Sequence, residues 1–140
     1  MSLCSLIFPA NNEPQRVTFG LLLGRILFGG MLATHGYDKL MAFSTLSTQF
    51  PDPIGFGSTV ALSLVIFAEL FCAVAVMFGL FTRLALIPII FNMFMAIMVA
   101  HQGSIFKGEL PALFLFAFVV LFIAGPGRCS IDQIFAKLRR

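Results

Sequence analysis

Two charged side chains lie inside long apolar segments of this sequence. Arg25 falls within the apolar segment 17–36, and Glu69 falls within the segment 59–81. A charge at membrane depth is costly, so such a residue faces the interior of a helix bundle and usually pairs with an opposite charge. We therefore expect one buried ion pair between Arg25 and Glu69, and helical rise places Asn92 in the same polar layer.

Two interpretations of this expected pair remain open. A buried Arg–Glu pair can serve only to fix the register and the partner choice of its helices. Alternatively, the pair belongs to a ligand or proton site, because a carboxyl group in a low-dielectric environment can carry a proton if its pairing is incomplete. Pairing with Arg25 would instead hold Glu69 in its ionised form.

Two histidines form a second candidate constellation. His35 and His101 lie near the same end of their apolar segments, and histidines on facing helices can bind haem or a metal ion. No nearby Cys, Asp or third His completes a metal-binding set, so we expect no metal site and do not favour haem. The polar residues that we expect to line the mouth of a pocket at that surface are His35, Tyr37, Asp38, Lys39 and His101.

Several functional classes lack their motifs in this sequence. It contains no G-x-S-x-G, no phosphate-binding glycine loop and no dinucleotide-binding motif. Cys4, Cys72 and Cys129 form no C-x-x-C pair, which argues against dithiol–disulfide chemistry. The basic residues are scattered singly, without a strip of aromatic side chains between them, so we expect no nucleic-acid partner.

The composition indicates that the candidate residues are carried by a membrane-embedded domain. Hydrophobic residues make up 59% of the 140-residue chain, and charged residues make up only 11%. A soluble fold could not cover its surface with so few polar groups. The length allows one membrane domain, residues 1–140.

Four apolar segments are long enough, or nearly so, to cross a bilayer as helices. Their expected bounds are 17–36, 59–81, 84–101 and 110–125, followed by a tail at 126–140. Between the first two we expect a short interfacial helix within residues 39–50, which Pro51 ends. The predicted fold class is therefore all-α, an integral membrane four-helix bundle.

The distribution of basic residues predicts the orientation of this bundle. Four spans place both termini on one side of the membrane, and the basic residues of that side are Arg16, Arg83, Arg128, Lys137, Arg139 and Arg140. The opposite side carries Lys39 and Lys107. Both termini are therefore expected in the cytoplasm.

Short motifs along the chain carry a resemblance to a known family. They are Arg25, the sequence HGYDKL with Gly36 and Lys39, then Glu69, the sequence GLFTR at 79–83, Ala96, Ala100 and His101, and the sequence GPGRCSID at 125–132. In their order and spacing these motifs resemble the DoxX family of small bacterial four-helix membrane proteins. The positions carried over from the family pattern, with no established role, are Arg25, Lys39, Glu69, Arg83 and Asp132.

The resemblance implies a multi-pass protein of the bacterial inner membrane that contacts the lipid bilayer and a redox enzyme complex. Because family names refer to quinol oxidase and thiosulfate–quinone oxidoreductase subunits, quinone is the cofactor that it suggests. The leading hypothesis is an accessory subunit of a quinone-linked assembly, with Arg25 and Glu69 at the polar end of a lipid-accessible pocket. The alternatives are a small-solute or proton-linked transporter or channel, which would require a homo-oligomer at this size, and a structural scaffold.

Overall fold

The computed structural model describes residues 14–138, and the secondary structure of this part of the chain is entirely helical. Cys4, Arg139 and Arg140 lie outside the described residues. The long elements are α2 (Gln15–Met41), α4 (Ser58–Ile66) continued by η1 (Phe67–Cys72) and α5 (Ala73–Phe78), α6 (Thr82–Met95) continued by η2 (Ala96–Ala100), and α7 (Glu109–Ala124). The two short helices are α3 (Phe43–Leu46) and α8 (Ile131–Leu138).

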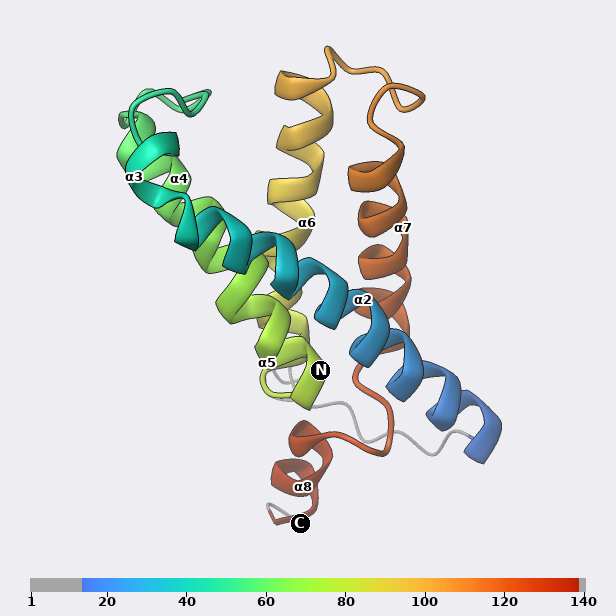
Figure 1. The fold of residues 1–140 in the computed structure, drawn as a ribbon. Helices are drawn as coiled ribbons and strands as arrows, with labels where there is room; N and C mark the ends of the chain where they lie inside the picture. Colours follow the sequence, from blue (N-terminus) through green and yellow to red (C-terminus); the bar gives the residue numbers. More distant parts are fainter. Residues whose placement is uncertain (1–13, 139–140) are drawn as a thin grey trace.

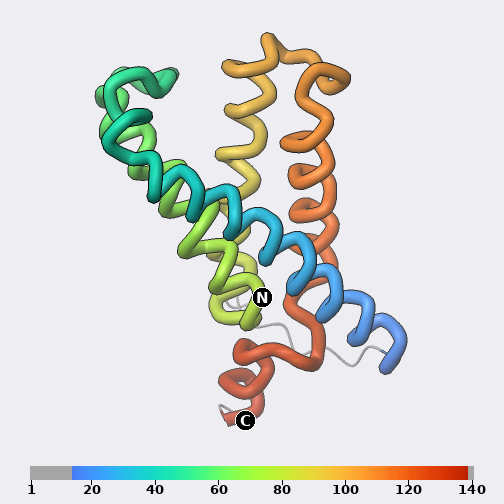
Figure 2. Tube along the Cα trace, in the orientation of Figure 1, coloured from blue at the N-terminus to red at the C-terminus, as the bar shows by residue number. Residues whose placement is uncertain are grey.

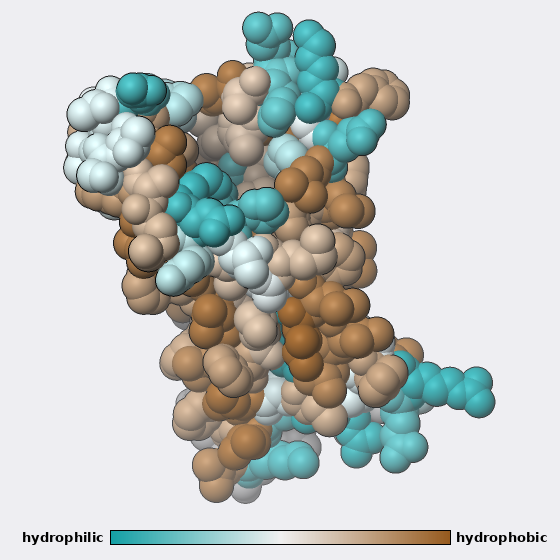
Figure 3. Space-filling model, viewed as in Figure 1, coloured by the Kyte–Doolittle hydropathy of each residue, from teal (hydrophilic) through white to brown (hydrophobic). Residues whose placement is uncertain are grey.

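Three of the helical units are long and apolar enough to cross a membrane, namely Gln15–Met41, Ser58–Phe78 and Thr82–Ala100. α7 is also apolar but has 16 residues, which is about 24 Å of helix against a hydrocarbon layer of about 30 Å. In Figure 3, apolar residues cover most of the visible face between its ends, and hydrophilic residues gather at the loop after η2, at the start of α2 and along the C-terminal half of α2.

The first long helix differs from its prediction in a way that matters for the site. We predicted that it ends near Gly36, but α2 continues to Met41 and α3 follows almost at once. No proline interrupts the chain between Gly36 and Pro51, and Lys39 in the last turn of α2 interacts favourably with the negative end of the helix dipole. As a result Lys39 is held on a rigid helix instead of in a loop.

α2 runs along the α4–η1–α5 unit and crosses α6 and α7 obliquely, whereas α6 and α7 run side by side (Figures 1 and 2). α2 packs against η1 and α5 on one side and against α7 on another, and α6 packs against α5, η1 and α7. α8 lies at the end of the molecule where α5 gives way to α6 (Figure 1). We call this the α8 end, and we call the end with α3 the α3 end.

Glycines on α2 set its register against the antiparallel α4–η1–α5 unit. A Cβ on Gly29 would lie 2.7 Å from Cγ of Met77, and a Cβ on Gly36 would lie 2.7 Å from the backbone of Glu69 and Leu70. Both glycines therefore let the two backbones approach closely, as small residues do between membrane helices. Gly29 contacts α5 and the later Gly36 contacts the earlier segment η1, so the two units run antiparallel.

The apolar core lies between α2, α5, α6 and α7. Phe114 and Phe118 of α7 stack on one another at 6.0 Å between ring centroids, and Phe28 of α2 meets Phe114 edge to face at 6.4 Å. The other fully buried apolar side chains of this cluster include Leu32, Ala73, Val76, Leu86, Ile89 and Met93. This core packs α5 and α6 against one another, and a cavity opens between the α4–η1 unit and the α6–η2 unit.

Candidate functional site

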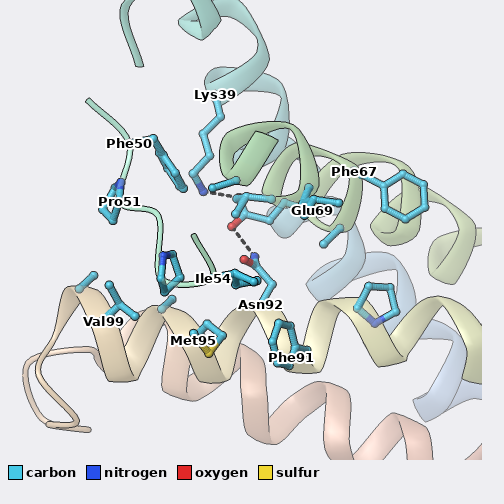
Figure 4. Close-up of a pocket in the computed structure, with 18 residues that line it drawn as sticks. Lys39, Phe50, Pro51, Ile54, Phe67, Glu69, Phe91, Asn92, Met95 and Val99 are labelled. Atoms are coloured by element: carbon cyan, nitrogen blue, oxygen red, sulfur yellow. Dashed lines mark hydrogen bonds and ion pairs between the residues drawn. The ribbon is translucent and has the colours of Figure 1, made fainter. Parts of the chain in front are cut away.

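A cavity of about 520 Å³ lies between the α4–η1 unit and the α6–η2 unit, near the α3 end. The loop that follows α3 covers it, and this loop contributes Phe50, Pro51, Pro53 and Ile54 to the lining (Figure 4). The apolar lining from the helices comprises Ala61, Leu64, Val65, Phe67, Ala68, Pro88, Phe91, Met95, Ala96, Val99 and Ala100. Among the described residues, the polar side chains at the cavity are Lys39, Glu69 and Asn92.

These three polar residues form one bonded cluster. The Lys39 ammonium donates to Oε2 of Glu69 as an ion pair, and Nδ2 of Asn92 donates to Oε1 of Glu69 at 2.9 Å. The Glu69 side chain is 6% exposed and that of Lys39 is 29% exposed. Each carboxylate oxygen thus has one donor, and the cluster carries no net charge as long as both ionisable groups are ionised. In Figure 4 the cluster lies at the inner wall of the cavity, with the loop residues facing it.

The helix that carries Glu69 is locally a π-helix, η1, and a second π segment, η2, ends the unit opposite. The wider turn of a π-helix changes which residues of a helix share a face, and such segments occur frequently at functional sites. Here both segments line the cavity: η1 contributes Phe67, Ala68 and Glu69, and η2 contributes Ala96, Val99 and Ala100. We predicted neither π-helical segment from the sequence.

The predicted ion pair between Arg25 and Glu69 is wrong. Glu69 is bonded to Lys39 and Asn92, and Arg25 donates through Nη2 to the backbone carbonyl of Cys129 near the α8 end. The prediction measured depth from the expected ends of the spans, but the observed register sets Arg25 beside Gly79, ten residues beyond Glu69 on the partner helix. That separation is about 15 Å along the helix, more than an arginine side chain spans.

The prediction that Asn92 lies in one layer with Glu69 agrees with their hydrogen bond, whereas Arg25 belongs to a different layer. Asn92 reaches Glu69 from α6, because α6 packs against η1. Lys39 was expected only at the mouth of a pocket. Instead Lys39, which follows Gly36 by three residues on α2, reaches back over the close contact of Gly36 with the backbone of η1 and bonds to Glu69.

Arg25 belongs to a second buried polar cluster, at the α8 end. Asp132, which is fully buried, accepts hydrogen bonds from the backbone N–H groups of Phe81 at 2.7 Å and Thr82 at 2.8 Å, and its own N–H donates to the carbonyl of Gly79 at 2.9 Å. It therefore caps the N-terminus of α6 and also gives Arg25 a negative charge within electrostatic range. This contact explains why the GLFTR and GPGRCSID sequences occur together: one supplies the turn and the other docks on it.

The remaining residues expected at the mouth of a pocket lie elsewhere. His35 meets Phe114 edge to face at 6.1 Å between ring centroids, and Tyr37 and Asp38 are exposed on α2. The ring of His101 packs against Gly108, where a Cβ would lie 2.8 Å from it. Only Lys39 of the predicted five borders the cavity, because successive residues of a helix point in different directions.

The loop that covers the cavity is organised by one carboxylate that the sequence analysis did not single out. Oδ1 of Asp52 accepts from the N–H groups of Ile54, Gly55 and Phe56 at 3.3, 2.9 and 3.2 Å, and Oδ2 accepts from Gly57 at 2.5 Å. The hydrogen bond from Gly57, and then those from the other amides, hold the pKa of Asp52 below its ordinary value. The signal for this turn is an Asp followed by two glycines, and both glycines adopt positive φ.

Long apolar helices with a polar cluster at their interior define this chain as a multi-pass membrane protein. The family model described as DoxX matches residues 20–102, which is more than half of the chain, so this protein belongs to the DoxX family. The matched residues include the whole Lys39–Glu69–Asn92 cluster, whereas the GPGRCSID sequence lies beyond them. A comparison with curated proteins found no match, and neither did a comparison with solved structures.

Proposed function

We propose that this protein is an accessory membrane subunit of a quinone-linked redox assembly and that its cavity holds the quinone head group. The observation that carries the proposal is an apolar cavity of about 520 Å³ with one polar cluster, Lys39, Glu69 and Asn92, on its wall. Sites for small molecules are typically apolar clefts with a few well-placed polar groups. A quinone has this character, since it is an apolar ring with two carbonyl oxygens.

The charge of the cluster favours an uncharged ligand over a permanent ion. Lys39 and Glu69 neutralise one another, so the cluster offers hydrogen-bond donors without a net charge. An ammonium group has three N–H donors and a primary amide has two, of which one each is used on Glu69. Lys39 and Asn92 therefore have further N–H donors for a carbonyl oxygen of the ligand.

The same cluster suits the protons that accompany quinone redox chemistry. A bound quinone supplies two-electron, two-proton chemistry, and the electrons would come from or go to the partner enzyme. The Glu69 carboxylate lies at the cavity wall and accepts hydrogen bonds from Lys39 and Asn92, so it is placed beside the atoms of the ligand that would take up or release protons. In this proposal the chain binds and orients the ligand and exchanges protons with it, without carrying electrons itself.

We further propose that α7 is the fourth span and that both termini lie in the cytoplasm of a bacterium whose inner membrane holds the protein. α7 packs along the full-length span α6–η2, which supports a transmembrane position for it. Its 16 residues would be accommodated by local thinning of the bilayer. Outside the expected spans, the described basic residues at the α8 end are Arg16, Arg83, Arg128 and Lys137, and they favour that end as the cytoplasmic one.

The test is to purify the full chain in a mild detergent and to quantify extracted quinone per protein by absorbance and mass spectrometry. The proposal expects a stoichiometric quinone in the wild type, loss of most of it in Lys39→Met, and normal content in the matched control Lys107→Met, whose lysine is exposed in the loop before α7. Ala96→Phe, which fills the cavity, should lower the content as well.

Co-purification of an oxidoreductase would support the second half of the proposal. The proposal would be rejected if the purified wild type carried no quinone, alone or with its partners, and if cells with Lys39→Met kept unchanged quinone-dependent respiration. Retention that is the same in Lys39→Met, Ala96→Phe and the wild type would also reject the cavity as the quinone site.

A further inference from the structure

The cavity that holds the polar cluster lies in a wedge between two helical units. η1 and α5 pack against α6, whereas α4 and α6 diverge toward the α3 end (Figure 1). Of α2 only Lys39 borders the cavity, and no described residue of α7 does. Apart from the two helical walls, the loop after α3 and Lys39, no described part of the chain encloses the cavity.

Two aromatic side chains mark where the helical walls of the cavity reach the outer surface. Phe67 of η1 is 52% exposed and Phe91 of α6 is 53% exposed, although both line the cavity. In Figure 4 the Phe67 ring lies on the side of Glu69 away from Pro51 of the loop. The cavity therefore has a lateral edge between η1 and α6, separate from the loop at the α3 end.

This lateral edge faces the hydrocarbon layer of the membrane. Asn92 lies eight residues before Ala100, the last residue of its span. That separation is about 12 Å of helix, and half of the hydrocarbon layer is about 15 Å. Phe91 precedes Asn92 and lies slightly nearer the middle of the membrane. A ligand that leaves the cavity at this level enters lipid and not water.

An exposed apolar surface continues from the lateral edge toward the middle of the membrane. Phe67 stacks on Phe71, four residues further along η1, at 6.3 Å between ring centroids, and Phe71 is 61% exposed. On α6, Ile87 shares a face with Phe91, four residues away, and is 53% exposed. Because η1 packs against α6, these two rows flank one path along the helices.

We propose that the ligand of this cavity carries a long hydrocarbon chain, which leaves between η1 and α6 and lies along Phe67, Phe71 and Phe91. This inference rests on the proposed function and narrows the ligand from any quinone to a membrane quinone with a long isoprenoid or alkyl chain. The head group binds at Lys39 and Asn92.

The size of the cavity and the position of its edge support this assignment. A cavity of about 520 Å³ accommodates a drug-sized molecule, so a longer chain must extend beyond it. Between η1 and α6 the chain stays in apolar surroundings, and binding transfers no hydrocarbon to water. The quinone thus enters from the bilayer, and the aromatic rings at the edge select for its chain.

The test is photo-cross-linking of the full chain in phosphatidylcholine nanodiscs. The probe is a benzoquinone whose decyl chain carries a diazirine next to the ring, and peptide mass spectrometry locates the adducts. We expect labelling within residues 64–71 and 87–91 that an excess of the same quinone without the diazirine suppresses. Phe116, which is 59% exposed on α7, should be labelled without suppression, since it only faces lipid.

A second measurement compares two competitors that have the same head group, one with the decyl chain and one without a chain. At equal concentration in the membrane, the chain should make suppression several-fold more effective. Phe67→Ala with Phe91→Ala should remove most of this difference, and Phe91→Ala alone serves if the double variant does not fold. The matched control Phe116→Ala should keep the difference.

The outcomes separate the chain exit from the proposed function. Suppressible labelling confined to the loop 50–54, or equal suppression by the two competitors, would overturn the exit between η1 and α6 and leave the quinone site intact. Absence of suppressible labelling at every residue would overturn both the exit and the quinone site.

Discussion

Two buried polar clusters occur on the inner face of α2, about 21 Å apart along its axis. Near the α8 end, Arg25 bonds to a backbone carbonyl while Asp132 bonds to backbone amides of the α5–α6 turn. Near the α3 end, Lys39, Glu69 and Asn92 bond to one another, side chain to side chain. A cavity adjoins the second cluster directly.

The difference teaches which cluster can change without unfolding the chain. Side chains that bond to backbone groups at helix ends and turns determine the path of the chain, so their loss leaves buried donors unsatisfied. Side chains that bond to each other at a cavity can exchange partners with a ligand, because no backbone group depends on them. We therefore expect stability to depend mainly on the Arg25–Asp132 cluster and ligand binding mainly on the Lys39–Glu69–Asn92 cluster.

The largest effect is expected for Asp132→Ala. The change removes the acceptor of two backbone N–H groups and the negative charge beside Arg25, so the free energy of unfolding should fall by about 3–5 kcal/mol. The measurement is thermal unfolding in detergent, together with the yield of monodisperse protein. Asp38→Ala, at an exposed position of α2, should leave both unchanged. Equal behaviour of the two variants would show that the α8-end cluster is dispensable.

A smaller loss of stability is expected for Gly36→Ala, which tests whether the packing of α2 on η1 positions Lys39. The new Cβ would lie 2.7 Å from the backbone of η1, so α2 must shift and Lys39 must move away from Glu69. Overpacking of this kind costs about 1–3 kcal/mol, and ligand retention should fall as well. The control is Gly20→Ala, since no atom lies within 4 Å of a Cβ there and alanine favours the helix by up to about 1 kcal/mol. Stability of Gly36→Ala equal to that of Gly20→Ala would disprove the close contact.

Glu69→Gln separates binding from stability. Glutamine keeps the size of the side chain and can still accept from Asn92, and Lys39 is exposed enough to be solvated. Because Glu69 is nearly buried, the free energy of unfolding should fall by about 1–3 kcal/mol, less than in Asp132→Ala. Quinone retention should fall several-fold, because the neutral cluster becomes positive. Glu109→Gln, at the exposed start of α7, is the matched variant. A large loss of stability with intact retention would reverse the roles assigned to the two clusters.

The helices themselves could be predicted well from the sequence, because long apolar segments have few alternatives. Each of the four expected spans contains a helix, and three of these helices are long enough to cross a membrane. The end of the first helix was the main error, since Tyr37 to Met41 are polar or mixed and were read as a connection. Helix propensity and the absence of proline continue the helix there, and hydrophobicity alone does not reveal this.

The partners of the charged residues could not be predicted in the same way. That Arg25 and Glu69 face the interior follows from the cost of a charge in lipid, and both are buried. Which residues they meet depends on the axial register of two helices, and here close contacts at Gly29 and Gly36 set that register. A stripe of glycines in the sequence indicates that a helix packs closely, but it does not say against which turn of its partner.

The smallest expected effect concerns the loop over the cavity and depends on pH. The pKa of Asp52 is lowered by the backbone N–H groups of Gly57, Gly55, Phe56 and Ile54, so the loop is stabilised by the ionised form. This stabilisation is fully present above the ordinary pKa of about 4 and is lost as the pH falls through the lower value of the folded loop. Amide hydrogen exchange of residues 54–57, measured relative to Asp52→Asn from pH 6 to pH 3, should therefore be protected at pH 6 and approach that of the variant at pH 3. Asp38→Asn should follow the wild type throughout. Because the carboxylate is fully exposed, the effect on global stability should be small. If the rate of quinone release rises together with the exchange of residues 54–57, the loop controls access to the cavity at the α3 end.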